Sequence, residues 1–285
     1  LGFMMRPNVI FLVTFLVNLA LVTPRIALGA NTEPAPEEVT VYANPAPVEH
    51  PLGITLDAQQ LEGIAGIQND AVSAVVTLPG IAVNNDFDTG IAIRGSRPED
   101  SRFFLDFLPV GYLFHLVGLS VVDTDVVEGF DLFGAGFDVD YQGVVGGIVD
   151  VRTRDPIDQG FAGLLDASIL DAGILVEGAI TGSQRAFFSA RISYYDVVLG
   201  TIIEKASEDD NEGVDIIQLP KYRDYRGRYQ VDVRDNLKLD VFIDGASDAV
   251  EFLFDDNASS VKLDPVFAGN HRFDISYDRM GAVLS

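Results

Sequence analysis

Apolar and polar side chains alternate along the last 125 or so residues of the chain, from about Gly160 onward. Successive side chains of a strand point to opposite faces, so a period of two predicts strands with one apolar face. The alternation is clearest at 188–194, 225–233, 237–244 and 273–278. Short turns are expected at Asp171–Gly173, Gly182–Gln184 and Asp235–Asn236.

The period does not say where the apolar face points. In a soluble sandwich it faces the core, whereas in a membrane barrel it faces lipid and the polar face lines the interior. Tyrosines near predicted strand ends favour the barrel, because aromatic side chains gather at membrane interfaces. These are Tyr194, Tyr195, Tyr222 and Tyr225.

Two stretches interrupt the alternation and are predicted to be external loops. Residues 202–220 are acidic, but the acids lack the offsets of an EF-hand, so we predict a solvated loop and no calcium site. Residues 244–265 are the second predicted loop.

The middle of the chain, 52–155, predicts a compact α+β unit of about 100 residues. Helical patches are expected at 56–61 and 69–78, the second ending at Pro79-Gly80. Short strands are expected at 91–94, 103–106, 121–130 and 148–152.

The N-terminus has the order of an export signal. Arg6 precedes the apolar run Val9–Val22, and small residues follow at Ala27, Gly29 and Ala30. We therefore predict a cleaved signal peptide at 1–30. A membrane anchor is the alternative, but the run falls short of the roughly 20 residues that span a bilayer.

Residues 31–51 contain five prolines and predict a flexible tether. The β-favouring island Val39–Tyr42 within it could add a strand to a partner's sheet, or could be the first strand of the next unit. The pattern alone leaves both open.

Composition narrows the function classes. The formal net charge of −24 excludes a nucleic-acid surface, which must be basic. The chain has no cysteine, and His50, His115 and His271 are far apart with no metal-like spacing. No nucleophile elbow or zinc-binding motif occurs. We therefore predict no enzyme, no metal site and no cofactor.

Five segments in register resemble motifs of the TonB-dependent outer-membrane receptors. Glu38–Ala43 resembles the TonB box, and Leu78–Val83 the turn that follows Leu-Pro-Gly in the plug domain of that family. Ile91–Gly95 and Phe104–Val110 resemble two plug strands, and Val127–Arg154 the glycine-rich closing segment. Phe107 stands where the family usually has glycine, and Gln142 is inserted between Tyr141 and Gly143.

The resemblance implies a fold and an order of domains. It implies an α+β plug domain at 52–155, followed by antiparallel transmembrane β-barrel strands at 156–285. About five to seven strands fit into that length, whereas the family's barrels have 22, so the barrel is expected to be incomplete and the chain a fragment.

The resemblance also implies a function and its residues. It implies energy-coupled uptake of a small-molecule ligand of unknown class across the bacterial outer membrane, with contacts to outer-membrane lipid and a TonB-type energy-coupling protein. The expected TonB contact is Glu38, Val39, Thr40, Val41, Tyr42 and Ala43. Expected plug–barrel contacts are Arg94, Arg152 and Arg154. Expected ligand-facing apices of the plug are Asn84, Asn85, Asp86, Arg97 and Glu99.

Two other functions stay open on the sequence. One is a non-transporting outer-membrane protein that keeps the plug fold as a binding or assembly module. The other is a soluble, β-rich periplasmic binding protein.

Overall fold

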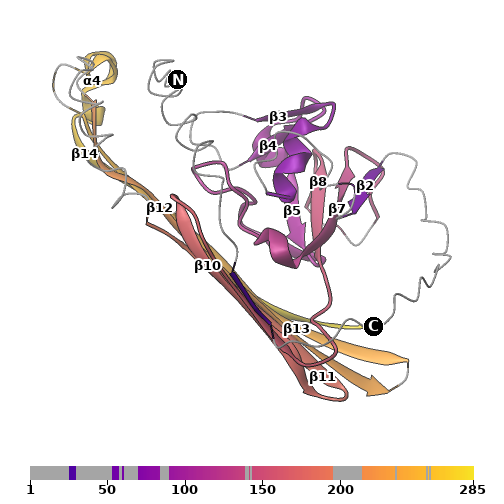
Figure 1. The fold of residues 1–285 in the computed structure, drawn as a ribbon. Coiled ribbons are helices and arrows are strands. Elements are labelled where there is room, and N and C mark those ends of the chain that lie inside the picture. The colour runs from indigo at the N-terminus through magenta and orange to yellow at the C-terminus, as the bar shows by residue number, and fades with distance from the viewer. Residues whose placement is uncertain are drawn as a thin grey trace.

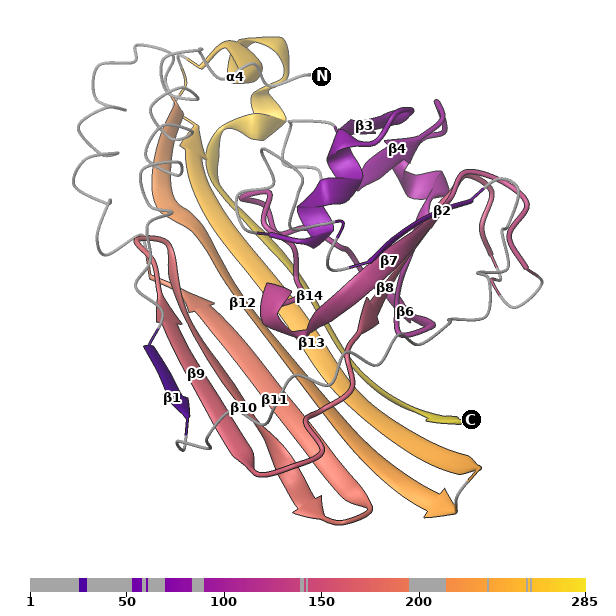
Figure 2. The same ribbon diagram turned by 45° about the vertical axis from the view of Figure 1, so that its right-hand side comes forward.

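A computed structural model describes most of the chain from residue 53 onward, together with one short N-terminal segment. The described residues are 26–29, 53–57, 60, 70–83, 90–138, 141, 143–194, 214–234, 236–254, 256 and 258–285. They form a compact α+β unit, residues 53–153, and a long antiparallel sheet (Figure 1). The compact unit lies on one face of the long sheet (Figure 2).

A five-stranded sheet is the centre of the compact unit. Its strand order is β2 (Gly53–Asp57), β7 (Val127–Phe133), β8 (Ile148–Thr153), β5 (Arg102–Leu105) and β6 (Leu108–Val110). Strands β5 and β8 run parallel, and the other neighbours are antiparallel. Strands β3 (Ile81–Val83) and β4 (Ile91–Ile93) form a separate hairpin-like pair.

Strand β8 is buried on both faces because it lies in the middle of this sheet. Val149 and Val151 pack into the main core with the 3-10 helix η1 (Val72–Thr77), while Ile148 packs on the other face with Phe104 and Phe133. Two shorter 3-10 helices, η2 (Pro98–Asp100) and η3 (Thr124–Val126), complete the unit.

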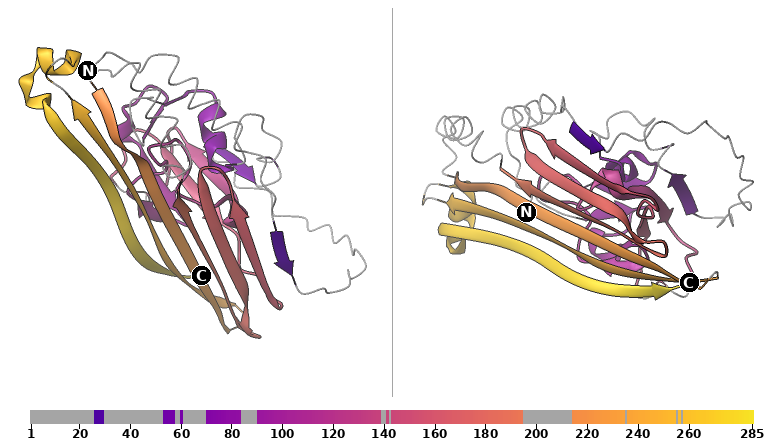
Figure 3. Two further views of the ribbon diagram at one scale, coloured as in Figure 1. Left: turned by 60° about the vertical axis from the view of Figure 1, so that its left-hand side comes forward. Right: turned by 60° about the horizontal axis from the view of Figure 1, so that its bottom comes forward.

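The long sheet contains seven strands among the described residues, each antiparallel to its neighbours. Their order is β1 (Ile26–Gly29), β9 (Phe161–Ala167), β10 (Asp171–Thr181), β11 (Gln184–Ser193), β12 (Val214–Arg234), β13 (Leu237–Phe254) and β14 (Gly269–Leu284). Helix α4 (Ser259–Leu263) and the 3-10 helix η4 (Pro265–Phe267) connect β13 to β14. Within the described residues the edge strands β1 and β14 do not pair with each other, and the sheet is open (Figure 3).

The two faces of the long sheet are the reverse of a soluble sheet. Large apolar side chains are exposed on the face away from the compact unit, among them Ile174, Val176, Phe188 and Ile192. Charged side chains of β12 and β13 are buried on the opposite face, among them Asp224, Arg226, Asp240, Asp244 and Asp248. This inversion is what a sheet needs when its outer face meets an apolar medium.

Several predicted elements are found where the alternation placed them. The four strands expected from the period lie within β11, β12, β13 and β14. The turn at Gly182–Gln184 is confirmed, because β10 ends at Thr181 and β11 begins at Gln184. Asn236 lies between β12 and β13, as expected for the third turn.

Other boundaries were wrong. Asp171 is the first residue of β10 and not part of a turn. The turn lies just before it, at residues 168–170, where the Ser168 hydroxyl accepts hydrogen bonds from the N–H groups of Leu170 and Asp171. The predicted loop from 244 is strand up to Phe254, because pairing with β12 and β14 continues along it. Likewise Val214–Pro220 belongs to β12 and not to a loop, and Leu56 and Asp57 belong to β2 and not to a helix.

Strand β1 comes from the predicted signal peptide. Ile26–Gly29 pairs with Ala162–Leu165 of β9. The other residues of 1–30 lie outside the described part of the chain, as does the whole predicted tether at 31–51, and the signal peptide stays a prediction. Among the described residues, no helix combines the length and the hydrophobicity needed to cross a membrane.

The turn between β5 and β6 holds two side chains in the left-handed region, with φ 47° at Asp106 and φ 67° at Phe107. This backbone costs an ordinary residue about 1–2 kcal/mol and costs glycine almost nothing. The Asp106 carboxylate stabilises the turn by accepting hydrogen bonds from the N–H and hydroxyl of Thr153.

We therefore expect Phe107→Gly to be more stable than Phe107→Ala. Both variants lose the ring contact with Tyr141, but only glycine relieves the left-handed strain. The expected difference in unfolding free energy is about 1 kcal/mol in favour of glycine. Urea denaturation of the two variants measures it, and a more stable alanine variant would contradict the observed turn.

Candidate functional site

The candidate site is the interface between the compact unit and the charged face of the long sheet. Its centre is Arg226 of β12, whose side chain is almost fully buried. The guanidinium pairs with Asp106 in the β5–β6 turn and, at 3.2 Å, with Asp244 of β13. One arginine thus joins a carboxylate of the compact unit to a carboxylate of the long sheet.

A second arginine holds the same turn from β14. Arg279 donates to both oxygens of Asp244, at 2.7 and 2.8 Å. Its other nitrogens donate to the backbone carbonyls of Leu105 and Pro109, each at 3.1 Å. Asp244 is therefore shared by two arginines, and the β5–β6 hairpin is bound through its side chains and its main chain.

A second cluster fixes the exit of the chain from the compact unit. Arg228 donates to the carbonyls of Thr153 and Arg154, at 2.9 and 3.1 Å, and pairs with Asp155 and Asp240. Burial raises the pKa of Asp155, but hydrogen bonds from Gln230 and Lys238 together with the charge of Arg228 outweigh it, so the net shift is downward.

A third cluster surrounds His115, which is only 1% exposed. Its Nδ1 lies 2.8 Å from Asp248 of β13, and its Nε2 lies 3.1 Å from Asp224 of β12. The N–H of Leu116 also donates to Asp248, at 3.1 Å. From β11, Arg191 pairs with Asp224 and donates to the carbonyl of Ser120 at 2.6 Å.

Apolar contacts are interspersed with these charges. Leu175, Phe187 and Ala246 of the long sheet join the core of the compact unit. Charge-assisted hydrogen bonds are short and directional, and removing one partner leaves a buried charge unpaired. Water can replace such a contact more readily than it can replace apolar packing. The interface can therefore hold the unit firmly and still separate in steps.

Of the three residues predicted to join plug and barrel, Arg154 contacts the long sheet, whereas Arg94 and Arg152 contact residues of the compact unit. Arg154 forms a two-pronged pair with Glu177 of β10, with both distances at 2.7 Å. Arg152 instead pairs with Asp131 inside the five-stranded sheet, because the two lie diagonally on adjacent strands. Arg94, at φ 52°, folds against Gly134 of its own unit. For Arg94 and Arg152 the expected contact with the barrel strands is thus replaced by contacts within the compact unit.

The remaining predicted residues lie elsewhere. Arg97 and Glu99 are exposed at η2. Asn84, Asn85 and Asp86, and the whole segment Glu38, Val39, Thr40, Val41, Tyr42 and Ala43, lie outside the described residues.

Sequence reasoning missed most of the residues that dominate the interface. His115, Arg226, Asp244 and Arg279 were not singled out. A signal existed for those on the strands, since Asp224, Arg226, Arg228 and Gln230 follow at every second position. No such signal existed for His115, whose partners are more than 100 positions away.

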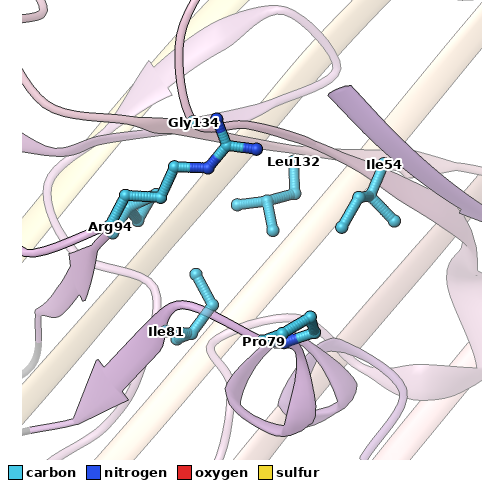
Figure 4. A pocket seen from close by; sticks show the side chains of 7 residues that line it. Ile54, Pro79, Ile81, Arg94, Leu132 and Gly134 are labelled. Carbon is cyan, nitrogen blue, oxygen red and sulfur yellow. The ribbon is translucent and has the colours of Figure 1, made fainter. Parts of the chain in front are cut away.

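A small crevice within the compact unit is lined by Ile54, Pro79, Ile81, Ile93, Arg94, Leu132 and Gly134 (Figure 4). Its cavity volume is about 10 Å³, roughly the space that a single water molecule needs. The guanidinium of Arg94 lies at its edge, beside Gly134. We therefore do not assign ligand binding to this crevice.

Comparison with known proteins identifies the fold. No family model matches the chain, and no curated protein matches it. Solved structures do match. The siderophore receptor PirA from Acinetobacter baumannii superposes with a TM-score of 0.54 at 15% identity, over 82% of this chain and 37% of the receptor.

Two further structures agree. A mutant of the ferric enterobactin receptor PfeA from Pseudomonas aeruginosa, in complex with enterobactin, gives a TM-score of 0.50 at 13% identity, over 81% of this chain and 38% of the receptor. The copper transporter OprC gives 0.50 at 11% identity, over 82% and 44%. The chain has the fold of a TonB-dependent outer-membrane receptor.

This chain spans less than half the length of these receptors. The fold class expected from the sequence is confirmed: an α+β unit followed by antiparallel strands that form part of a barrel. At these identities the likeness establishes the fold, and the activity is a matter for proposal.

The central ion pair gives a test of the interface. Arg226→Gln removes the buried cation between Asp106 and Asp244, so Asp106 loses its ion pair with β12 and Asp244 keeps its pair with Arg279. Breaking a buried pair in this way costs about 3–5 kcal/mol. We expect that loss in the unfolding free energy, with earlier protease cleavage of the compact unit.

The matched control is Arg272→Gln on β14. Arg272 pairs with Asp274 at 2.7 Å, but both side chains are more than half exposed. Exposed pairs contribute little, so this variant should behave as wild type. Equal losses of unfolding free energy in the two variants would mean that the buried ion pair contributes no more to stability than the exposed one.

Proposed function

We propose that this protein is an outer-membrane receptor that takes up a small-molecule ligand, with the compact unit as a plug and the long sheet as part of the surrounding wall. The observation that carries the proposal is the inverted long sheet. Its charged face is covered by the compact unit, and its apolar face is left exposed. A soluble sheet would bury the apolar face instead.

The outer face of the sheet changes character at one row of paired residues. Tyr225 of β12 pairs with Gly245 of β13, which pairs with Asp278 of β14. On one side of this row the outward positions are apolar, as at Ile243 and Met280. On the other side the first outward positions are polar: Arg223, Ser247 and Ser276.

The apolar band has the height of a bilayer core. On β12 it runs from Tyr225 to Val233, about nine residues, and a transmembrane strand needs about 9–11. Tyr225 lies at its upper limit, and its hydroxyl donates to Asp278 at 2.8 Å. An aromatic ring with a polar tip suits that interface. We therefore place the outer boundary of the lipid core at this row.

Tryptophan fluorescence tests the placement, because the chain contains no tryptophan. Ile243 and Ser247 lie on the same strand and face outward, one below and one above the boundary row. With brominated lipids we expect strong quenching of Ile243→Trp and little quenching of Ser247→Trp. Absence of quenching in both, with recovery of the protein in the soluble periplasm, would favour the soluble binding protein.

Energy coupling is proposed for the segment Glu38–Ala43. A short extended segment can add a strand to a partner's sheet through main-chain hydrogen bonds. The partner would be a TonB-type protein, which draws on this segment to loosen the plug. The charged interface between the compact unit and the long sheet supports this loosening of the plug, since water can replace its contacts one at a time.

Deleting residues 38–43 should abolish uptake and leave binding of the ligand intact. Uptake is measured in cells, and binding in isolated membranes, with ferric siderophores and copper as first probes because the structural neighbours are receptors and transporters for these. A variant with residues 44–49 deleted serves as the control for tether length. Unchanged uptake after removal of 38–43 would favour a non-transporting outer-membrane protein.

The ligand would approach from the side of the compact unit that carries Arg97 and Glu99, which are exposed at η2. Together with Asn84, Asn85 and Asp86 they are the proposed ligand-facing positions of the plug. The proposed location is the outer membrane, reached through the signal at residues 1–30.

A further inference from the structure

His115 is placed differently from an ordinary buried histidine. Both ring nitrogens face a carboxylate oxygen, and the two carboxylates belong to neighbouring strands of the long sheet. The ring itself belongs to the compact unit. It lies against the ring of Tyr222, with centroids 4.5 Å apart, and is closed off from solvent.

The hydrogen-bond geometry distinguishes the two charge states of the ring. A neutral imidazole has one N–H and one lone pair, whereas an imidazolium has two N–H groups. In the neutral ring a lone pair would point at a carboxylate oxygen about 3 Å away, an arrangement that repels. Only the protonated ring can donate to Asp224 and Asp248 at once.

The surroundings of the ring hold few other charges. From β11, Arg191 shares Asp224 with the ring. Tyr112 lies edge-on to His115 and to Tyr277 of β14, and Tyr222 donates to Asp171 of β10 at 2.7 Å. Burial opposes a charge on the ring, but the hydrogen bonds to Asp224 and Asp248 outweigh it, so the pKa of His115 is raised.

One further acid lies near this cluster. Asp123 interacts with Arg191, and burial raises the pKa of its carboxyl to about 6. Its Oδ1 accepts from the N–H of Asp125 and begins η3. The pKa values of Asp123 and His115 are both shifted upward, so a variant of Asp123 is needed to separate the two effects.

We propose that His115 is a proton-dependent pin that holds residues 112–120 of the compact unit against β12 and β13. In the protonated state it cross-links the unit to two strands. When the ring loses its proton, one of the two hydrogen bonds to Asp224 and Asp248 is lost. Residues 112–120 then separate from β12 and β13 before the rest of the compact unit does. The proposal rests on the proposed function in one respect: a compact unit that acts as a plug must be held by the long sheet and released from it.

The direction of the effect follows from the raised pKa. The stabilisation is fully present below the ordinary histidine value near 6.5. It is lost as the pH rises through the higher value of the folded protein. Alkaline conditions should therefore loosen the segment, whereas acidification down to about pH 6.5 should leave it bound.

The first measurement is NMR of the ring nitrogens in the whole protein. The chain has three histidines, so labelling histidine alone gives few signals, and His115→Gln identifies the one from His115. We expect that signal to be the protonated form above the pH at which free histidine titrates. A neutral ring at pH 7 would overturn the proposal even if every variant failed to fold.

The second measurement is hydrogen exchange of residues 112–120 between about pH 6 and pH 9, corrected for the intrinsic exchange rate. In the wild type, opening should increase about tenfold across the titration of His115, the loss of one charge-assisted hydrogen bond. In His115→Gln it should be high throughout and independent of pH. A flat wild-type profile, or the same step in His115→Gln, would overturn the proposal.

Two variants complete the design. Asp248→Asn removes one of the two charges that hold the proton, so the step should move to lower pH; an unmoved step counts against the pin. Asp123→Asn is the matched control, since its Oδ1 can still accept from Asp125, and it should keep the wild-type step. The readouts need neither uptake nor lipid, so failure of the proposed transport function would leave this test unaffected.

Discussion

The structure depends on one constraint: the long sheet carries its charges on the face that the compact unit covers. Arg226 and Asp244 are almost fully buried, and a buried charge needs a partner within hydrogen-bond reach. The partners come partly from the compact unit, through Asp106 and the backbone carbonyls of its β5–β6 hairpin. Without that unit these arginines and carboxylates would face each other and water, and the geometry of the interface would be lost.

The same constraint explains the form of the compact unit. Its β5–β6 turn accepts left-handed backbone at Asp106 and Phe107, and this conformation brings the Asp106 carboxylate to both Thr153 and Arg226. Strain in a turn is tolerated where the surroundings fix it. Here a single carboxylate closes the turn, caps the end of β8 and anchors the unit to β12.

The alternation of residues predicted much of the fold. It located β11 to β14, because the alternation of side chains between the two faces is a local property of each strand. It failed where a strand extends beyond its apolar band. Residues 214–220 and 245–254 read as loops because they interrupt the alternation of apolar and polar residues, yet in the second stretch Ala246, Asp248 and Val250 are buried. Pairing with neighbouring strands decided their structure.

The interface was harder to predict than the fold. Arg154 could be inferred from its position at the end of the compact unit, but Arg94 and Arg152 have partners within their own unit. The partners of His115 and Asp106 on the long sheet lie more than 100 residues further along the chain, and nothing local marks them. Charged residues at every second position of β12 did mark one side of the interface, without showing what would cover it.

The most direct test of the account is to cut the chain between the two parts and ask whether they stay together. A protease site introduced at Asp158–Gly160, an exposed turn after the compact unit, allows the cut in the folded protein. The account predicts that the compact unit remains bound to the long sheet through gel filtration at physiological salt, because buried pairs are screened little. Immediate release of the compact unit from the cut protein would contradict it.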